Sequence, residues 1–196
     1  MDILDLNKEY WDSRYKNRQT GWDIGYASPA LIEYAETVIP KEASILIPGC
    51  GNAYEAKALL ESGFENITLL DIAPTLVHQV QKNFGEAAQV RVICQDFFEH
   101  GEKYDYILEQ TFFCALDPSL RKKYSNKMAE LLHPNGILAG LLFNRKFDFE
   151  GPPFGGKKSG YQQLFQKDFH ILKMENCSNS IPQRQGSELF IVLKRK

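Results

Sequence analysis

The sequence lacks the features that mark an exported, membrane-spanning or metal-binding protein. No apolar run approaches the ~18 residues that a membrane span needs. The first ten residues, MDILDLNKEY, are acidic and lack the basic start and apolar stretch of a signal peptide. The four cysteines form no C-x-x-C pair and have no regular spacing, which favours reduced thiols over disulfides or zinc. We therefore expect a cytoplasmic protein that contacts no membrane and holds no metal.

The sequence also has little excess charge. Its formal net charge is -2, and the basic run KRK at positions 194–196 is too short for a nucleic-acid patch. The 196 residues, 43% of them hydrophobic, suit one domain with a real core. We expect a monomer without a nucleic-acid partner.

Strand-like and helix-like segments alternate along the chain, which predicts an α/β fold with a mostly parallel sheet and helices on both faces. Strands are expected at 44–48, 66–71, 89–96, 104–110, 137–143, 169–176 and 188–196. Helices are expected at 29–38, 53–62, 74–84, 118–132 and 161–166. The HPNG stretch at 133–136 reads as a turn, and residues 144–160 read as a long Gly/Pro-rich loop.

The glycine turn after the first strand, SILIPGCGNAYE, points to a ligand. Gly49 and Gly51 let the backbone approach a bound molecule closely. A dinucleotide fingerprint requires a third glycine, and Tyr54 stands in its place. The turn therefore argues against a pyrophosphate-containing cofactor.

Acidic residues end the next two strands, at the edge of the sheet where such folds bind ligands. Asp71 lies 20 residues after Gly51, the spacing of an acid that accepts from ribose hydroxyls. Its alternative role is that of a carboxylate at a helix N-terminus. Asp96 and Phe97 are suited to an adenine, although Asp96 also fits a cap or turn. Together these residues favour an adenosine-containing cofactor.

Six short motifs and an aromatic leader resemble one enzyme family. The motifs are ILIPGCGNAYEA, LLDIA, CQDFF, EQTFFCALDP, LLHPNGIL and EGPPF, preceded by the leader WDSRYKNRQTGWDIGYASPAL. They look like the thiopurine S-methyltransferase family of class I S-adenosylmethionine-dependent methyltransferases, in its halide/thiol branch. The resemblance implies a Rossmann-like sheet of seven strands, the last inserted antiparallel. It also implies a lid segment at 1–28, a methyltransferase domain at 29–196, and the product S-adenosylhomocysteine.

The resemblance also assigns cofactor contacts. The implied cofactor-binding residues are Trp11, Tyr15, Trp22, Gly49, Gly51, Asp71, Asp96, Phe97 and Gln110. Tyr15 stands where the family usually has tryptophan, and Gln110 where this branch often has tyrosine. The leader aromatics could form a wall around the sulfonium cation or pack as ordinary core residues.

The residues that would bind the methyl acceptor are less clearly indicated by the sequence. Phe112, Phe113 and Phe154 could line an acceptor pocket or belong to the core, and Arg184 could attract an anion or be a solvated loop charge. Tyr15 is a further candidate for positioning. No histidine lies in a catalytic motif, so the chemistry should rely on positioning and desolvation rather than on a base.

We expect methyl transfer to a small-molecule acceptor, a soft nucleophile such as a thiol, another sulfur anion or a halide. A thiopurine-type aromatic thiol is the alternative acceptor. Two other classes remain open: an NAD-dependent oxidoreductase, against which Tyr54 argues, and a protein that holds the cofactor without turnover.

Overall fold

The computed structural model describes residues 5–196, so residues 1–4 of the expected lid lie outside it. The strands are β1 (Ile45–Pro48), β2 (Ile67–Asp71), β3 (Val90–Cys94), β4 (Tyr104–Gln110), β5 (Leu132–Phe143), β6 (Phe169–Asn176) and β7 (Glu188–Arg195). The α-helices are α1 (Lys8–Lys16), α2 (Pro29–Val38), α3 (Tyr54–Glu61), α4 (Pro74–Phe84), α5 (Arg121–Glu130) and α6 (Lys158–Phe165). Four short 3-10 helices are η1 (Phe97–Glu99), η2 (Phe113–Ala115), η3 (Pro118–Leu120) and η4 (Pro182–Arg184).

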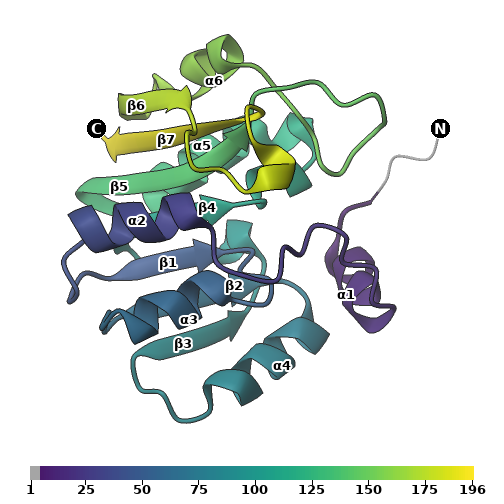
Figure 1. Ribbon diagram of the computed structural model, residues 1–196, viewed down its shortest axis with the longest axis vertical. Coiled ribbons are helices and arrows are strands. Elements are labelled where there is room, and N and C mark those ends of the chain that lie inside the picture. Colours follow the sequence, from purple (N-terminus) through teal and green to yellow (C-terminus); the bar gives the residue numbers. More distant parts are fainter. Residues whose placement is uncertain (1–4) are drawn as a thin grey trace.

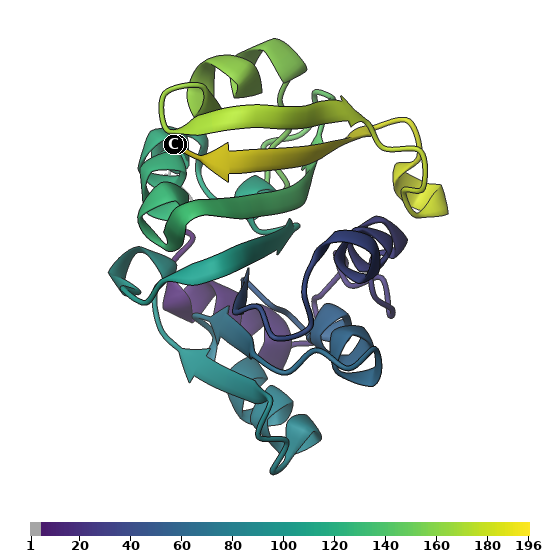
Figure 2. The ribbon, with the colours of Figure 1, turned by 90° about the vertical axis from the view of Figure 1, so that its left-hand side faces the viewer.

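The seven strands form one sheet in the order β3-β2-β1-β4-β5-β7-β6. The pairs from β3 to β5 are parallel, whereas β7 runs antiparallel to both β5 and β6. Figure 2 shows β7, in yellow, lying between β5 and β6. The expected Rossmann-like, seven-stranded sheet with an inserted antiparallel strand is confirmed.

Helices cover both faces of the sheet (Figure 1). Apolar residues of α2, α3 and α4 pack on one face, where Leu31, Leu59 and Val80 are fully buried. Tyr124 of α5 and Phe165 of α6 pack on the other face. Strands β1 and β2 are buried along their whole length, as expected for central parallel strands covered on both sides.

Several expected boundaries differ in the structure. Helix α6 begins at 158, inside the expected loop 144–160, and β3 is shorter than expected. The HPNG stretch lies inside β5 as an irregularity: Leu132 pairs with Tyr104 and Ile137 with Tyr106, so the residues between them bulge out of the ladder. Asn135 adopts φ +67° there, a conformation that asparagine tolerates. The helix expected over 118–132 is divided into η3 and α5, because Asp117 accepts from the amide of Ser119 and starts a tighter turn.

The leader contains a helix that its sequence did not predict. Helix α1 begins after Asn7, whose side chain accepts from the amide of Tyr10. Its residues are mostly polar, so they lack the apolar stripe that usually indicates a helix. The helix lies beyond the carboxyl ends of β1 to β4 and contacts α4 (Figure 1).

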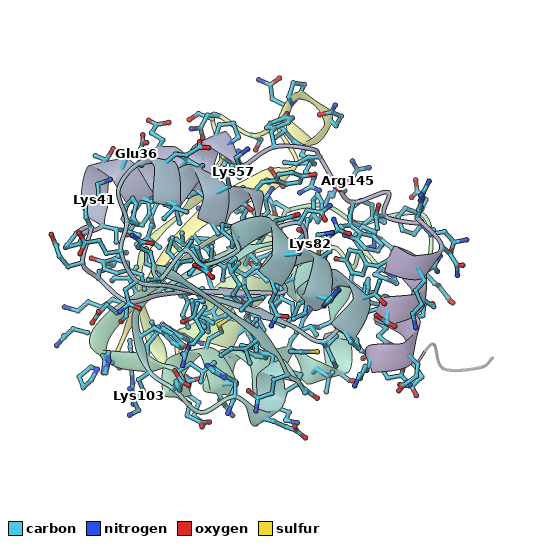
Figure 3. The ribbon with its side chains drawn as sticks, turned by 90° about the horizontal axis from the view of Figure 1, so that it is seen from below. Glu36, Lys41, Lys57, Lys82, Lys103 and Arg145 are labelled. Atoms are coloured by element: carbon cyan, nitrogen blue, oxygen red, sulfur yellow. The ribbon has the colours of Figure 1, made fainter. Side chains whose placement is uncertain are left out.

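The charged residues are distributed over the surface. Side chains such as Lys41, Lys57, Lys82 and Lys103 extend outward from different parts of the molecule (Figure 3). None of the helices in the described residues is both long enough and apolar enough to cross a membrane.

Candidate active site

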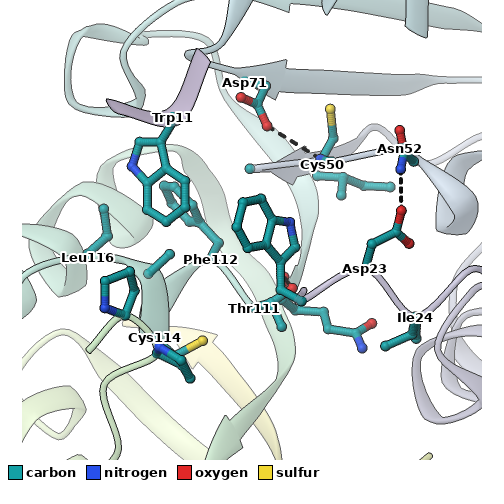
Figure 4. Close-up of a pocket in the computed structure, with 18 of the residues that line it drawn as sticks. Trp11, Asp23, Ile24, Cys50, Asn52, Asp71, Thr111, Phe112, Cys114 and Leu116 are labelled. Atoms are coloured by element: carbon teal, nitrogen blue, oxygen red, sulfur yellow. Dashed lines mark hydrogen bonds between the residues drawn. The ribbon is translucent and has the colours of Figure 1, made fainter. Parts of the chain in front are cut away.

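A cavity of about 590 Å³ lies at the carboxyl ends of the parallel strands, where such folds bind ligands. The glycine turn after β1, the ends of β2 and β3 and the segment after β4 form its floor. The leader, the 144–157 loop and η4 form its outer wall. Figure 4 shows side chains from these segments converging on the cavity.

The glycine turn has the backbone that its sequence requires. Gly49 has φ +60° and Gly51 has φ +52°, a region that favours glycine. A Cβ atom on Gly49 would also lie 2.9 Å from Cγ of Phe112, too close for an ordinary contact. On Gly51 it would meet only the Tyr15 hydroxyl, at 3.8 Å. Position 49 therefore requires glycine for both its backbone conformation and its packing, and position 51 requires it for its conformation.

Asp71 is buried at the end of β2 and lines the cavity. Its Oδ1 accepts from the amide of Ala73 at 3.0 Å, and its Oδ2 accepts from the amide of Gly51 at 3.4 Å, a bond drawn in Figure 4. Burial raises its pKa to about 6, against the opposing effect of the backbone amides. The carboxyl thus supports both the start of α4 and the glycine turn, and it still reaches the cavity.

Asp96 and Phe97 lie together on the wall beside η1. The Asp96 carboxylate accepts from the amide of Phe98 at 2.8 Å, which makes it the cap that its sequence allowed. Phe97 is almost fully buried and packs edge-on against Phe112, with ring centroids 5.0 Å apart. Both residues therefore combine a structural contact with a place on the cavity wall.

The leader aromatics form a compact group over the cavity. Trp22 packs edge-on against both Trp11 and Tyr15, with ring centroids 5.5 Å and 5.8 Å apart. Trp11 and Tyr15 line the cavity and also contact the hydrophobic core. Burial, assisted by the nearby Asp71 carboxylate, raises the pKa of Tyr15, so its phenol stays protonated at neutral pH.

Two aspartates of the leader hydrogen-bond to the rest of the domain. The Asp12 carboxylate accepts from the amide of Thr75 in the first turn of α4, at 2.7 Å. The Asp23 carboxylate accepts from the side-chain amide of Asn52, beside the glycine turn, and from the hydroxyl of Tyr54 at 3.3 Å. Figure 4 shows the contact between Asp23 and Asn52. The sequence analysis did not identify either acid, because their partners lie far away in the chain.

Arg184 is not a solvated loop charge. Its side chain is 12% exposed and lines the cavity. The guanidinium donates to the carbonyl of Trp22 at 3.3 Å, lies 3.5 Å from the Glu188 carboxylate, and lies 5.5 Å from the centre of the Phe143 ring. It therefore brings a positive charge to the wall and ties η4 to the leader.

The three candidate phenylalanines lie in three different environments. Phe112 lines the cavity. Phe113 does not: it is buried in the core against Tyr124, with ring centroids 4.9 Å apart, so its alternative role as a core residue is correct. Phe154 lines a neighbouring cavity instead. Gln110 lies on the main wall, and its buried Oε1 has no hydrogen-bond partner among residues 5–196.

Glu109 is a functional candidate that the sequence analysis missed. It is fully buried at the end of β4, and its Oε1 accepts from the amides of Phe112 and Phe113 at 3.0 Å and 2.9 Å. Burial raises its pKa to about 7. The carboxyl therefore fixes the segment that presents Phe112 to the cavity. An acid in the otherwise apolar run YILEQ was the only sequence signal.

The cavity wall also includes two of the four cysteines, Cys50 and Cys114. Burial raises the pKa of Cys50 well above its ordinary value and that of Cys114 to about 12. Both therefore remain neutral thiols at neutral pH. Together with the protonated Tyr15, they make the wall an environment of aromatic rings and uncharged groups around a small number of buried charges.

The fold is that of the class I S-adenosylmethionine-dependent methyltransferases. The structure superposes with a TM-score of 0.75 on the 1,6-didemethyltoxoflavin-N1-methyltransferase of Burkholderia thailandensis, solved with S-adenosylhomocysteine. The two are 18% identical, over 96% of this chain and 87% of that one. Magnesium protoporphyrin IX methyltransferase of Synechocystis gives a TM-score of 0.73 at 15% identity, over 96% and 97% of the two chains.

Residues 6–193 match the thiopurine S-methyltransferase family, and the chain belongs to it. Among its relatives, "Probable thiol methyltransferase 2" of Arabidopsis thaliana is 31% identical over 184 residues, which are 91% of this chain and 81% of that protein. "Thiocyanate methyltransferase 1" of the same plant is 27% identical over equal shares. Family membership, which gives S-adenosylmethionine as the cofactor, sets aside the nicotinamide-dependent alternative.

Proposed function

We propose that the protein transfers the methyl group of S-adenosylmethionine to a small sulfur nucleophile that arrives as an anion. In this proposal the Asp71 carboxylate accepts from the ribose hydroxyls, Asp96 and Phe97 hold the adenine, and the glycine turn contacts the methionine part. These places on the wall support the assignment. The described part of the expected lid, residues 5–28, closes over the cofactor, supported by the hydrogen bonds of Asp12 and Asp23.

The observation that carries the proposal is the position of Arg184, whose side chain is 12% exposed, on a cavity wall that includes several aromatic rings. A methyl group is displaced in line, so the acceptor must approach it from the side opposite the sulfonium sulfur. Phe112, Phe143 and Phe147 provide apolar surface that strips water from a soft anion. The guanidinium of Arg184 offers that anion a compensating charge at the same wall. The names of the thiol and thiocyanate methyltransferase relatives agree with such an acceptor.

The protonation states of the wall support an acceptor that is ionised before it binds. Tyr15, Cys50 and Cys114 all have raised pKa values and hold their protons at neutral pH, so none of them accepts a proton from the substrate. In this proposal the Asp71 carboxylate accepts hydrogen bonds from the ribose hydroxyls instead of taking a proton from the acceptor. The enzyme then contributes alignment and desolvation, with alignment worth about 7–11 kcal/mol in favourable cases.

The four free cysteines fit our further expectation of a cytoplasmic protein.

The test is the pH dependence of the reaction across a series of acceptors: sulfide, thiocyanate, aliphatic and aromatic thiols, a thiopurine and iodide. We expect kcat/KM for each thiol to rise toward the pKa of that thiol, near ~8.5 for an unperturbed one, and the iodide curve to be nearly flat. Methyl transfer measured with a labelled cofactor gives the curves. One apparent pKa shared by all acceptors, iodide included, would instead indicate a base on the enzyme. No turnover with any of them would favour a protein that holds the cofactor without catalysis.

A further inference from the structure

A second cavity adjoins the first. It has a volume of about 540 Å³ and lies between the 144–157 loop and the segment that starts at Asp117. Arg145, Phe147 and Pro153 line both cavities. These three residues therefore form the partition between the acceptor end of the active site and a space that nothing in the reaction has yet used.

The partition belongs to a loop that is fixed at its ends and free of hydrogen bonds between them. The amide of Gly156 donates to the carbonyl of Arg145 at 3.0 Å, and the amide of Phe154 donates to the carbonyl of Cys114 at 2.7 Å. Within the described chain, no hydrogen bond involves residues 146–153. Segments with so few hydrogen bonds rearrange at low cost, while their anchored ends keep the movement local.

Phe147 is the bulkiest part of the partition, and only packing holds its side chain. Its ring lies edge-on to Phe143 at 5.1 Å and tilted against Phe149 at 5.2 Å, and the Arg145 guanidinium is 4.9 Å from its centre. Turning this ring breaks no hydrogen bond and opens the partition.

The acceptor needs a route that the cofactor does not block. Under the proposed function the leader covers the cofactor through the contacts of Asp12 and Asp23. The acceptor must approach the methyl group from the side away from the sulfonium sulfur, and the 144–157 loop contributes Arg145, Phe147 and Pro153 to the wall of the same cavity. The walls of the second cavity carry three basic residues (Arg145, Lys146 and Lys157) against two acidic ones (Asp117 and Glu150), a balance that suits an incoming anion.

We propose that the second cavity is the vestibule through which the anionic sulfur acceptor enters, and that Phe147 is the gate whose size selects the acceptor. This inference rests on the proposed function, because it takes the acceptor to be a small anion. It gives the enzyme separate routes for its two substrates, so that an acceptor reaches the cofactor complex while the leader stays closed.

The experiment varies the size of residue 147 and the size of the acceptor together. Phe147→Trp should lower kcat/KM for a bulky aromatic thiol about 10-fold more than kcat/KM for sulfide, the scale of a small steric change in an apolar pocket. Phe147→Ala should raise kcat/KM for the bulky thiol relative to sulfide. Both variants should bind S-adenosylhomocysteine as tightly as the wild type by calorimetry. Leu172→Trp, which adds similar bulk at an exposed position on β6, should change none of these values.

The outcomes separate the two hypotheses. If the wild type turns over no sulfur acceptor, the proposed function fails, whatever the variants do. If the wild type is active but the variants change all acceptors equally, or weaken S-adenosylhomocysteine binding, Phe147 is not a gate. If Leu172→Trp changes kcat/KM for the bulky thiol as much as Phe147→Trp does, the gate hypothesis is overturned too. If Phe147→Trp does not fold, Phe147→Leu and Phe147→Ala test the gate in the widening direction, by a rise in kcat/KM for the bulky thiol relative to sulfide.

Discussion

Among single residues, Asp71 should couple cofactor binding to pH if it contacts the ribose as proposed. Burial raises its pKa to about 6, so folding favours its protonated form. In the protein without cofactor, the stability that this group contributes is therefore present at low pH and is lost as the pH rises through about 6. Ribose hydroxyls that donate to the carboxylate would offset this loss. S-adenosylhomocysteine should then raise the melting temperature more above pH 6 than below it.

The matched variant is Asp71→Asn, which keeps the shape and removes the charge. It should weaken S-adenosylhomocysteine binding by about 1.5–3 kcal/mol, the worth of hydrogen bonds to a charged group, or about 10-fold or more in affinity. It should also lose the pH dependence of the stabilisation. Calorimetry and thermal unfolding measure both effects, and unchanged affinity in a folded variant would contradict the ribose contact.

Gly49 allows a second test at a single position, because Gly63 provides its control. Both glycines have positive φ, +60° and +84°. An alanine at either position should cost about 1–2 kcal/mol of stability for its left-handed backbone. A Cβ on Gly63 meets nothing within 4 Å, whereas one on Gly49 lies 2.9 Å from Cγ of Phe112.

Gly49→Ala should therefore also displace Phe112 and reduce cofactor affinity and turnover, effects that Gly63→Ala should not share. Chemical denaturation measures the stability of the two variants, and calorimetry measures their binding of S-adenosylhomocysteine. If both variants bind the cofactor equally well, the contact between Gly49 and Phe112 does not shape the site.

At the scale of elements, α1 supplies the cap that α4 lacks. Ala73 precedes α4 and has no side-chain acceptor, so the Asp12 carboxylate takes the amide of Thr75 instead. Removing such a cap usually costs about 0.5–2 kcal/mol. Asp12→Ala should thus loosen the leader and lower cofactor affinity several-fold, whereas Lys16→Ala, which removes the ion pair between the exposed Lys16 and Asp12 but keeps the cap, should have a smaller effect.

Hydrogen exchange measures this coupling in residues 5–28. In the wild type, S-adenosylhomocysteine should slow exchange there, as expected if the leader closes over the cofactor. Asp12→Ala should exchange faster than Lys16→Ala without ligand, and S-adenosylhomocysteine should reduce the difference. Equal exchange with and without ligand in the wild type would argue against a lid.

For the whole molecule, the sequence predicted the parts of the fold that depend on local patterns. Alternating strands and helices, the glycine turn and the spacing between Gly51 and Asp71 follow from apolar periodicity and backbone chemistry. The order of the first five strands is the usual outcome of right-handed crossovers. The position of β7 between β5 and β6 came from the resemblance to a family and not from any local pattern.

The parts that the sequence did not predict depend on contacts between distant residues. The cap that Asp12 provides to α4 joins positions 63 residues apart, and neither segment signals the other. Helix α1 is too polar to show a hydrophobic stripe, and its contact with α4 stabilises it instead. Phe113 and Phe112 are adjacent, and only the backbone after β4, held by Glu109, turns one toward the core and the other toward the cavity.

The hydrogen bond from Arg184 to the Trp22 carbonyl has a consequence for how the protein is made. The ribosome adds Arg184 162 residues after Trp22, so the leader leaves the exit tunnel long before its partner exists. Strand β6 likewise cannot pair until β7 has been made, because β7 is its sole neighbour in the sheet that residues 5–196 form. A growing chain can assemble β1 to β5 early, but it cannot complete the cavity wall until Arg184 and β7 have been made. Under the proposed function, a nascent chain that ends before η4 would therefore lack the charge that attracts the acceptor, and turnover would appear only after Arg184 has been added.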